Sequence, residues 1–304
     1  MNRATGFTNN AGATTIMKLW HEPAGRVGLA LVTLVLAVAV FGPMLVSHPP
    51  NDSFFASGKD PLGLPVGPCS QHWLGTDTLF RDLLSRLVHG ARLSLSIAVS
   101  SSAIALSIGV VAGIIASLCY QTRLHLIDAA IMRLVDAALA VPYLLFVMAI
   151  GSLLDSVQAV PDTLALVVIL GTTGWLGTCR LVRAKTIQLQ RRDFVLAAKG
   201  LGQSTVGVIA KHLLPNMAGP ILVTASSSMA SMILAESVLS YLNVGVRPPQ
   251  ATWGRMLREG QSFLTADPRL VAVPAIAILV TVVGFHLIGE GVRDAVDPYS
   301  QPRG

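Results

Sequence analysis

Charge is scarce in this chain. Only 12% of its 304 residues are Asp, Glu, Lys or Arg, whereas 52% are hydrophobic. A soluble domain usually carries about 25% charged residues. So few charges over this length argue against an ordinary soluble domain and indicate a protein embedded in a membrane.

The sequence also lacks the motifs of an enzyme that binds nucleotides. The stretch from Ala197 to Asn216, AAKGLGQSTVGVIAKHLLPN, has the glycines and the Ser-Thr pair of a phosphate loop but no G-x-x-x-x-G-K-[ST]. No nucleophile–base pair and no cofactor motif stands out elsewhere. We therefore expect that the chain neither hydrolyses ATP by itself nor holds a cofactor.

A compact basic patch interleaved with aromatic residues is missing as well. Lys and Arg outnumber Asp and Glu by 22 to 16, but they are spread along the chain, as is common in membrane proteins. The sequence therefore predicts membrane lipid as a partner and no nucleic acid.

Metal-ligand patterns are weak. The cysteines Cys69, Cys119 and Cys179 show no ligand spacing, and the last two lie in apolar segments, where small buried hydrophobic residues are the expected meaning. His286 and Glu290 stand four residues apart, but a closed zinc site uses four ligands. No metal site is predicted.

Long charge-poor runs are what the sequence does have. A helix needs about 20 largely apolar residues to cross a bilayer. The runs predict an all-α membrane protein with six transmembrane helices, placed at Val27–Val46, Leu93–Tyr120, Ala137–Leu154, Thr163–Cys179, Leu213–Leu242 and Leu270–Gly289. The first run is too long for the apolar part of a signal peptide and is followed by SHPPND, so we interpret it as a retained helix.

These runs divide the chain into segments. The prediction is an N-terminal tail at 1–26, a first helix at 27–47, an extracytoplasmic segment at 48–92, a five-helix core at 93–298 and a C-terminal tail at 299–304. Within the core, a cytoplasmic loop spans 185–215 and an extracytoplasmic loop spans 243–269.

Orientation follows from Lys and Arg in the loops, which are enriched on the cytoplasmic side. The loop between the fourth and fifth runs is the most basic, with Arg180, Arg183, Lys185, Arg191, Arg192, Lys199 and Lys211. The short loop from Asp155 to Asp162 carries acids and no base. Both chain ends are therefore predicted to be cytoplasmic.

The basic loop reads as two short helices. Asp193 is predicted to cap the first, which runs to about Gly200, and Gly202 is predicted to end it in a left-handed conformation. One apolar face of this helix is formed by Phe194, Ala197, Ala198 and Leu201.

Ser204 is predicted to cap the second helix, and Pro215 to bend the chain where that helix ends. Its apolar face consists of Val206, Ile209, Ala210 and Leu213, beside Lys199, Lys211 and His212. A small apolar face with basic neighbours suits a helix that docks on a cytoplasmic partner. By spacing alone, a linker lying on the membrane surface is an equal alternative.

The basic loop resembles the EAA loop of permease subunits in binding-protein-dependent ABC importers. Here Leu196-Ala197-Ala198 is followed by Gly202 and then by HLLP ending at Pro215. Leu196 stands where the family often has Glu, and His212 where it often has Ile. In that family this coupling loop sits in a cleft of the ATPase subunit. The resemblance assigns ATPase docking to Asp193, Leu196, Ala197, Ala198, Gly202, Ser204, Val206, Ile209, His212, Leu214 and Pro215.

Four further segments resemble the "C-type" permease of dipeptide, oligopeptide and nickel importers. They are HWLGTDTLFRDLLSRLVHGARLSL (72–95), MRLVDAALAVP (132–142), AESVLSYLNVGVRPPQATWGRML (235–257) and RDAVDP (293–298). The sequence departs from that pattern at Phe80 and at Asn243, where the family usually has Gly.

The resemblance implies a type I ABC importer permease fold in the bacterial cell membrane that imports short peptides. Its partners would be a second homologous permease subunit in a heterodimer, two ABC ATPase subunits or a fused pair that bind ATP and Mg²⁺, and an extracytoplasmic substrate-binding protein. Nickel or another small solute is the alternative cargo. An ion-coupled secondary transporter is a third hypothesis, but internal repeats and broken helices, which are common in that class, are not evident in the sequence.

Three residues within or at the edge of the apolar runs are candidates for the translocation path, because ionisable and polar groups are costly there. Asp136 can contact substrate or pair with Arg133 on its own helix. Glu236 lies about 30 Å along a helix from Pro215, where it can meet a peptide amine or bond to the loop that follows. Ser227 belongs to a run of small polar residues that either lines the path or packs tightly.

Overall fold

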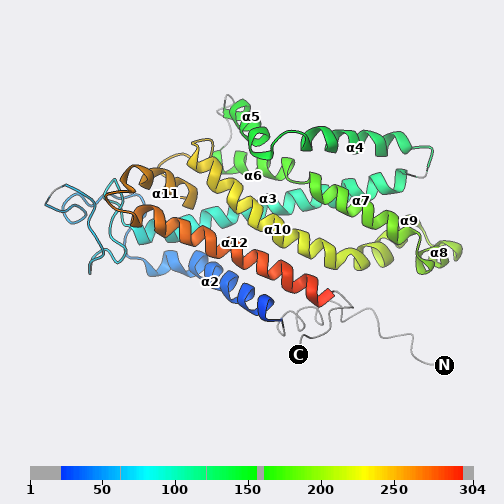
Figure 1. Cartoon of the computed structure of the whole chain (residues 1–304), viewed down its shortest axis with the longest axis horizontal. Helices are drawn as coiled ribbons and strands as arrows, with labels where there is room; N and C mark the ends of the chain where they lie inside the picture. The colour runs from blue at the N-terminus through cyan, green and yellow to red at the C-terminus, as the bar shows by residue number, and fades with distance from the viewer. Residues whose placement is uncertain (1–21, 62, 121, 156–160, 297–304) are drawn as a thin grey trace.

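A computed structural model describes residues 22–61, 63–120, 122–155 and 161–296 of the chain (Figure 1). Helices account for nearly all regular structure in these ranges, and their only β contacts are isolated bridges in the loop at 46–82. The all-α prediction is confirmed. The predicted tails at 1–26 and 299–304 fall mostly or wholly outside the described residues, as does most of the short loop at 155–162.

Five helices, or directly joined helix pairs, are long and apolar enough to cross a membrane. They are α2 (Pro23–Leu45), α3 (Leu83–Cys119), α6 with α7 (Asp162–Thr173 and Leu176–Gln190), α9 to α10 (Thr205–Tyr241) and α12 (Arg269–Val296). A sixth span results if the bent pair α4 (His125–Leu139) and α5 (Tyr143–Asp155) counts as one. The structure thus agrees with the six predicted spans.

The third predicted span is broken. The sequence analysis placed one apolar helix body at Ala137–Leu154, but α4 ends at Leu139 and α5 starts at Tyr143, with 93° between them. Pro142 lies in the break, and a proline disfavours helical geometry in the residue before it. A broken helix is therefore present here, which the apolar run did not indicate.

The second span starts earlier than predicted. Helix α3 begins at Leu83 rather than Leu93, because the Asp82 side chain caps it by accepting the Ser85 N–H at 2.8 Å. Charged residues in the first turns had excluded this part from the apolar run. The structure accommodates one of them, Arg86, in buried ion pairs described below.

The long helices lie side by side along the long axis of the molecule (Figure 1). Helix α3 contacts α2, α4, α6, α7 and α10, and α12 packs against α2 and α10. Short helix α11 (Trp253–Gly260) and the α2–α3 loop (46–82) lie at one end of this bundle. Short helices α8 (Asp193–Gly200) and α9 (Thr205–Val208) lie at the other end.

Small residues bring α3 close to α7. A Cβ atom on Gly109 would stand 2.6 Å from the Thr178 Cβ, and one on Gly113 would stand 2.7 Å from the Cys179 carbonyl oxygen. This GxxxG pair therefore serves the close helix packing that its spacing predicts. Cys119 and Cys179 are buried and free, also as predicted.

Candidate functional site

The basic loop between α7 and α10 starts with helix α8. Its N-cap is Arg192, which makes no side-chain capping bond, and Asp193 is the first helical residue. The prediction of Asp193 as the cap was wrong by one residue. Its carboxylate still lies in the first turn, where a negative charge interacts favourably with the helix dipole.

Gly202 ends α8 as predicted, with φ of +78°. The N–H of Gln203 donates to the Ala198 carbonyl at 3.1 Å, and the N–H of Gly202 donates to the Lys199 carbonyl at 3.0 Å. These two bonds form a Schellman motif, which requires a left-handed residue at this position. The chain therefore turns sharply between α8 and α9.

Ser204 caps α9 as predicted, since its Oγ accepts the Gly207 N–H at 3.2 Å. The predicted bend at Pro215 is replaced by a continuous helix. A π-helical turn at Ile209–Leu213 joins α9 to α10, and the Leu214 N–H donates five residues back to the Ile209 carbonyl. The π turn changes the hydrogen-bond register just before Pro215, so the missing N–H of proline does not interrupt the helix.

The buried side of the loop fixes it to the bundle. Ala198 and Leu213 are buried, as are other apolar side chains from α7 to α10, namely Val182, Val195, Val208 and Met217. Three residues of the predicted first apolar face, Phe194, Ala197 and Leu201, are instead exposed. The buried face of α8 is rotated relative to the prediction, because Val195 replaces Phe194 in the core.

The exposed side of the loop carries large apolar side chains. Leu201 is 89% exposed and Val206 74% exposed, one on each side of the Gly202 turn, and Phe194 and Leu196 are also exposed. We call these four side chains the coupling surface. Lys199 and Lys211 of the same loop are exposed as well. Exposed apolar side chains gathered in one short loop are typical of a site that another protein covers.

His212 belongs to the rim of this surface. Its Nε2 lies 2.9 Å from the Gln203 Oε1, and its ring centroid lies 6.2 Å from that of Phe194. His212 follows α9, so these contacts connect the residues after α9 to the turn before it and to α8.

Asp136 forms an ion pair with Arg180 of α7, rather than with Arg133 of its own helix. Both side chains are about half exposed, so the pair lies on an accessible surface of the bundle. One turn away, Arg183 makes two bonds to Asp128 at 2.5 and 2.7 Å. These pairs join α4 to α7, which makes Asp136 a link between helices as well as a path candidate.

Glu236 is completely buried. Its carboxylate accepts the Ser94 hydroxyl of α3 at 3.0 Å and the Ser240 hydroxyl at 2.8 Å. The backbone N–H of Trp253, at the start of α11, donates to the same Ser94 oxygen at 3.3 Å. Of its two predicted roles, the geometry favours the structural one, because Glu236 faces α3 and not an open surface.

Ser227 is exposed on α10, and the Ser231 hydroxyl donates to its carbonyl oxygen one turn later. On the neighbouring face, the Ser228 hydroxyl contacts the Ser102 hydroxyl of α3 at 3.3 Å. The serines of this run therefore have different surroundings. Ser228 packs against α3, and Ser227 remains available to line a path.

A buried ion network at the other end of the bundle was not predicted. Arg81 and Arg86 contact Glu259 of α11 at 2.5 and 2.9 Å, and both contact Asp77, at 2.7 and 3.2 Å. Glu259 lies 178 and 173 positions from the two arginines, so spacing could not reveal its part in the network. The network fastens the α2–α3 loop to α11, so these two segments form one folded cap.

The two departures from the family pattern share a backbone feature. Phe80 has φ of +60° and Asn243 has φ of +64°, and no other non-glycine residue in the described ranges has positive φ. Glycine adopts positive φ readily, so the family's usual glycine at both positions indicates that the backbone is left-handed there.

Comparisons with known proteins agree with this geometry. Residues 109–299 match the family described as "Binding-protein-dependent transport system inner membrane component". The chain is 37% identical to the oligopeptide transport system permease protein of Bacillus subtilis, over 93% of this chain and 90% of that protein. It is 37% identical to a dipeptide transport system permease protein of Alkalihalophilus pseudofirmus, over 90% and 84% of the two chains.

A di/tripeptide transport system permease protein of Pseudomonas aeruginosa is 35% identical, over 91% of this chain and 89% of its own. The matches cover nearly the whole length of the chain, including the coupling surface and the folded cap. The chain therefore belongs to the family of inner membrane components of binding-protein-dependent transport systems, the permease subunits of ABC importers.

Proposed function

We propose that this permease subunit imports short peptides into the cytoplasm and is driven by separate ATPase subunits that dock on the coupling surface. Relatives that match over most of the chain are named for oligopeptide, dipeptide and di/tripeptide transport. The chain has no phosphate-loop motif. In this proposal, ATP and Mg²⁺ bind to the partner ATPase subunits rather than to this chain.

The observation that carries the proposal is that the loop has exposed apolar side chains on one side and buried apolar side chains on the other. Leu201 and Val206 are largely exposed, whereas Ala198 and Leu213 of the same loop are buried. A loop that only linked two helices would gain nothing from a rigid apolar tip. A partner that covers this tip supplies the missing burial, worth about 25 cal/mol for each Å² of apolar surface.

The same loop supports the orientation that we propose. Its exposed arginines and lysines favour the cytoplasmic side, so the proposal has α8 and α9 inside and the cap of α11 and the α2–α3 loop outside. Both chain ends are then cytoplasmic. The cap is in position to receive the substrate-binding protein. Exposed apolar side chains on α10 and α12, such as Leu222 and Leu279, are available to a second homologous permease subunit or to lipid.

Transport then follows from a change between two arrangements of the bundle. Helix α9 continues through the π turn into α10, so a displacement of the coupling surface moves α10 without an intervening hinge loop. Ser227 lies exposed on α10 and moves with it. Binding of ATP to the partner subunits shifts the bundle by favouring one arrangement of the surface that they hold.

Uptake by the assembled transporter in proteoliposomes tests the proposal. Labelled dipeptide should accumulate when ATP is enclosed with the ATPase subunits, and a proton gradient without ATP should give none. Uptake of Ni²⁺ but no peptide would reject the peptide cargo. Uptake driven by the proton gradient alone would reject the ABC importer mechanism.

Native cysteines allow a direct test of orientation. Cys69 is exposed on the α2–α3 loop, whereas Cys119 and Cys179 are buried. A membrane-impermeant maleimide should label Cys69 in cells whose outer envelope has been made permeable and whose inner membrane is intact. In a Cys69→Ser background, Gln188→Cys should be labelled only after the membrane is permeabilised. The opposite pattern would reject the orientation.

A further inference from the structure

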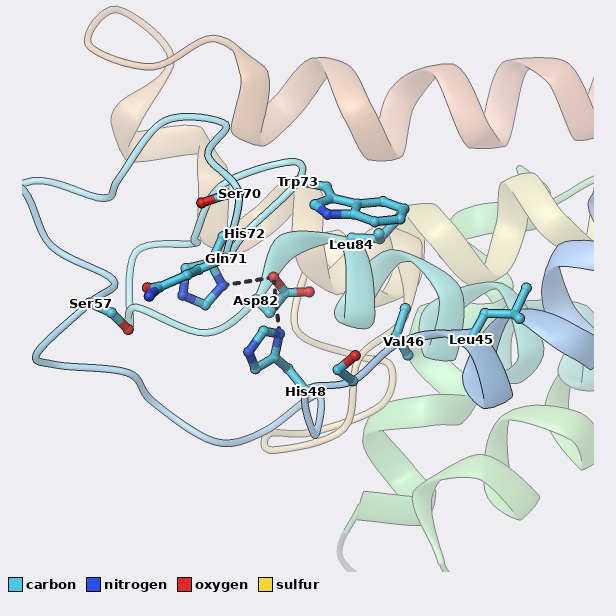
Figure 2. A pocket seen from close by; sticks show the side chains of 11 residues that line it. Leu45, Val46, His48, Ser57, Ser70, Gln71, His72, Trp73, Asp82 and Leu84 are labelled. Carbon is cyan, nitrogen blue, oxygen red and sulfur yellow. Dashed lines mark hydrogen bonds and ion pairs between the residues drawn. The ribbon is translucent and has the colours of Figure 1, made fainter.

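The folded cap contains a cavity of about 520 Å³ between the end of α2 and the start of α3 (Figure 2). Two histidines and one aspartate line it, His48, His72 and Asp82, and no step of the proposed transport uses them. They come from three separate parts of the chain. His48 follows α2, His72 belongs to the α2–α3 loop, and Asp82 caps α3.

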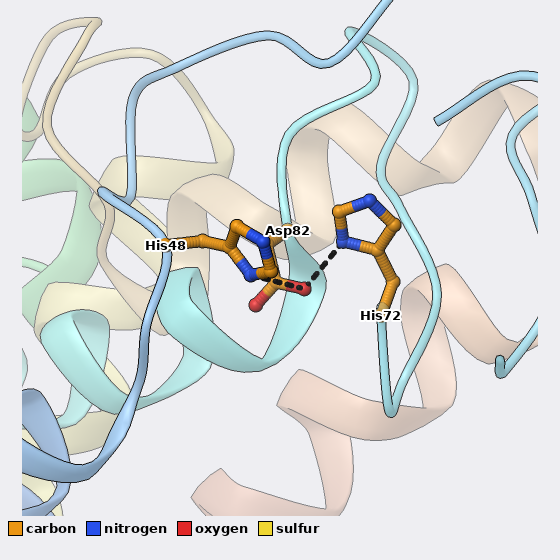
Figure 3. Close-up of side chains that lie close together, drawn as sticks. All are labelled: His48, His72 and Asp82. Carbon is orange, nitrogen blue, oxygen red and sulfur yellow. Dashed lines mark hydrogen bonds and ion pairs between the residues drawn. The ribbon is translucent and has the colours of Figure 1, made fainter. Parts of the chain in front are cut away.

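The three side chains converge on one point. His72 Nδ1 lies 2.9 Å from Asp82 Oδ1, and His48 Nδ1 lies 3.9 Å from the same oxygen (Figure 3). All three potential ligand atoms lie within 4.8 Å of one another. Ligands bound tetrahedrally to Zn²⁺ at their usual bond lengths are about 3.3 Å apart. The observed distances bracket that spacing, so small side-chain rotations suffice to bind one ion.

Hydrogen bonds within the cluster involve only some of its polar side-chain atoms. Only the His72–Asp82 contact is short enough for a hydrogen bond. His72 is 1% exposed, and its Nε2 has no partner among the described residues. The candidate ligand atom of His72 is Nδ1, which faces Asp82, whereas Nε2 points away from Asp82 (Figure 3).

The surrounding contacts hold the three side chains in place. Asp82 keeps its other oxygen on the Ser85 N–H at 2.8 Å, and the Ser85 hydroxyl donates to the His48 carbonyl at 2.6 Å. The ring of Phe54 lies 4.8 Å from that of His48 and 5.3 Å from that of His72. Outer contacts of this kind orient metal ligands, and an apolar wall limits the access of water.

We propose that His48, His72 and Asp82 bind a divalent transition-metal ion. Imidazole nitrogens suit Zn²⁺ and its first-row neighbours, whereas Ca²⁺ and Mg²⁺ prefer oxygen ligands. Three protein ligands leave a coordination position open toward the cavity. The bound ion ties the end of α2, the α2–α3 loop and the start of α3 together, so it clamps the cap in one arrangement.

Cobalt binding to the full-length chain, purified with its partner permease in nanodiscs, tests the site. After treatment with a chelator, Co²⁺ should bind at one equivalent per copy of this chain and give the strong visible absorption of a four- or five-coordinate ion. His48→Gln should weaken Co²⁺ binding at least about tenfold. His125→Gln, at an exposed position beyond the far end of α3, is the matched control and should bind like the parent protein.

Zn²⁺ should also raise the thermal midpoint of the parent protein and of the control, but not that of His48→Gln. His48 is 30% exposed in its side chain, so this substitution is expected to fold. If it does not fold, Asp82→Asn keeps a capping oxygen for α3 and removes the charged ligand. Absence of a stoichiometric Co²⁺ spectrum, or equal affinity in the parent and a folded site variant, would reject the site and leave a purely structural cluster.

Discussion

The Ala198 carbonyl oxygen accepts the backbone N–H of Gln203 at 3.1 Å, across the left-handed turn at Gly202. This bond turns the chain so that Leu201 and Val206 are both presented to the surroundings, while Ala198 stays buried. The shape of the coupling surface therefore depends on backbone geometry at one residue, and substitutions there separate docking from folding.

Gly202→Val should impair docking without preventing membrane insertion. An added Cβ meets no atom within 4 Å at Gly202 or at Gly200, but only Gly202 has positive φ. A left-handed conformation costs an L-residue about 1–2 kcal/mol. In membranes, Gly202→Val should recover fewer ATPase subunits on pull-down at normal permease levels, whereas Gly200→Val should recover the normal amount. Equal recovery by both variants would show that the turn does not matter.

Ala198→Asp should destabilise the loop, whereas Ala197→Asp should not. Ala198 is buried against α9 and α10, so an aspartate there buries an unpaired charge at a cost of several kcal/mol. Ala197 is exposed, so an aspartate there stays in water. Hydrogen exchange of residues 193–213 should accelerate in Ala198→Asp only. Similar protection in both variants would contradict the buried base of the loop.

Asn243 offers a test of the backbone at the edge of the cap. Its φ is +64°, and its Oδ1 accepts an Arg255 N–H at 2.7 Å. Replacement by Gly or Ala removes this bond equally, but only Gly adopts the positive φ without strain. Asn243→Gly should therefore be more stable than Asn243→Ala by about 1 kcal/mol. At the exposed helical residue Ala184, the parent should be more stable than Ala184→Gly. Thermal midpoints decide, and the same order at both positions would refute the left-handed assignment.

Asp267 predicts an acid-dependent loss of stability. It pairs with Arg269, whose hydrogen bond holds the pKa of Asp267 below its ordinary value of 3.8. A lowered pKa stabilises the fold above the unfolded pKa, and this contribution is lost as the pH falls through the folded value. The parent's advantage over Asp267→Asn in thermal midpoint should thus hold from pH 7 to about 4 and shrink below that.

The exposed residue Asp52 provides a control, since Asp52→Asn should differ little from the parent across the same range. Arg269 also donates to the Leu74 carbonyl at 2.8 Å and thereby joins α12 to the α2–α3 loop. An advantage over Asp267→Asn that persists unchanged at pH 3 would mean that the ion pair does not contribute to stability.

Features set by local sequence were predictable. The apolar runs located the spans, because a helix that crosses lipid must satisfy its own backbone and carry apolar side chains. Gly202 and Ser204 were assigned correctly because a left-handed turn and an N-cap depend on the residue itself and its nearest neighbours. The π turn before Pro215 was missed, since the same proline permits either a bend or a change of hydrogen-bond register.

Features that depend on distant segments were not predictable from spacing. Asp136 pairs with Arg180, although Arg133 is closer in sequence. The contact between Arg86 and Glu259 joins residues 173 positions apart. Burial of Val195 in place of Phe194 depends on how α7 and α10 surround α8. Each of these requires the packing of the bundle, which a single sequence with no alignment does not specify.

Crosslinking at Val206 tests the central claim most directly. Val206 is 74% exposed at the tip of the coupling surface. In a background with Cys69→Ser, Val206→Cys in the assembled transporter should crosslink to the ATPase subunit through a short bifunctional reagent. Ser70→Cys, in the exposed α2–α3 loop, should give no such product. We predict one specific adduct between this permease and the ATPase. Its absence from an active complex that contains both subunits would contradict docking at this surface.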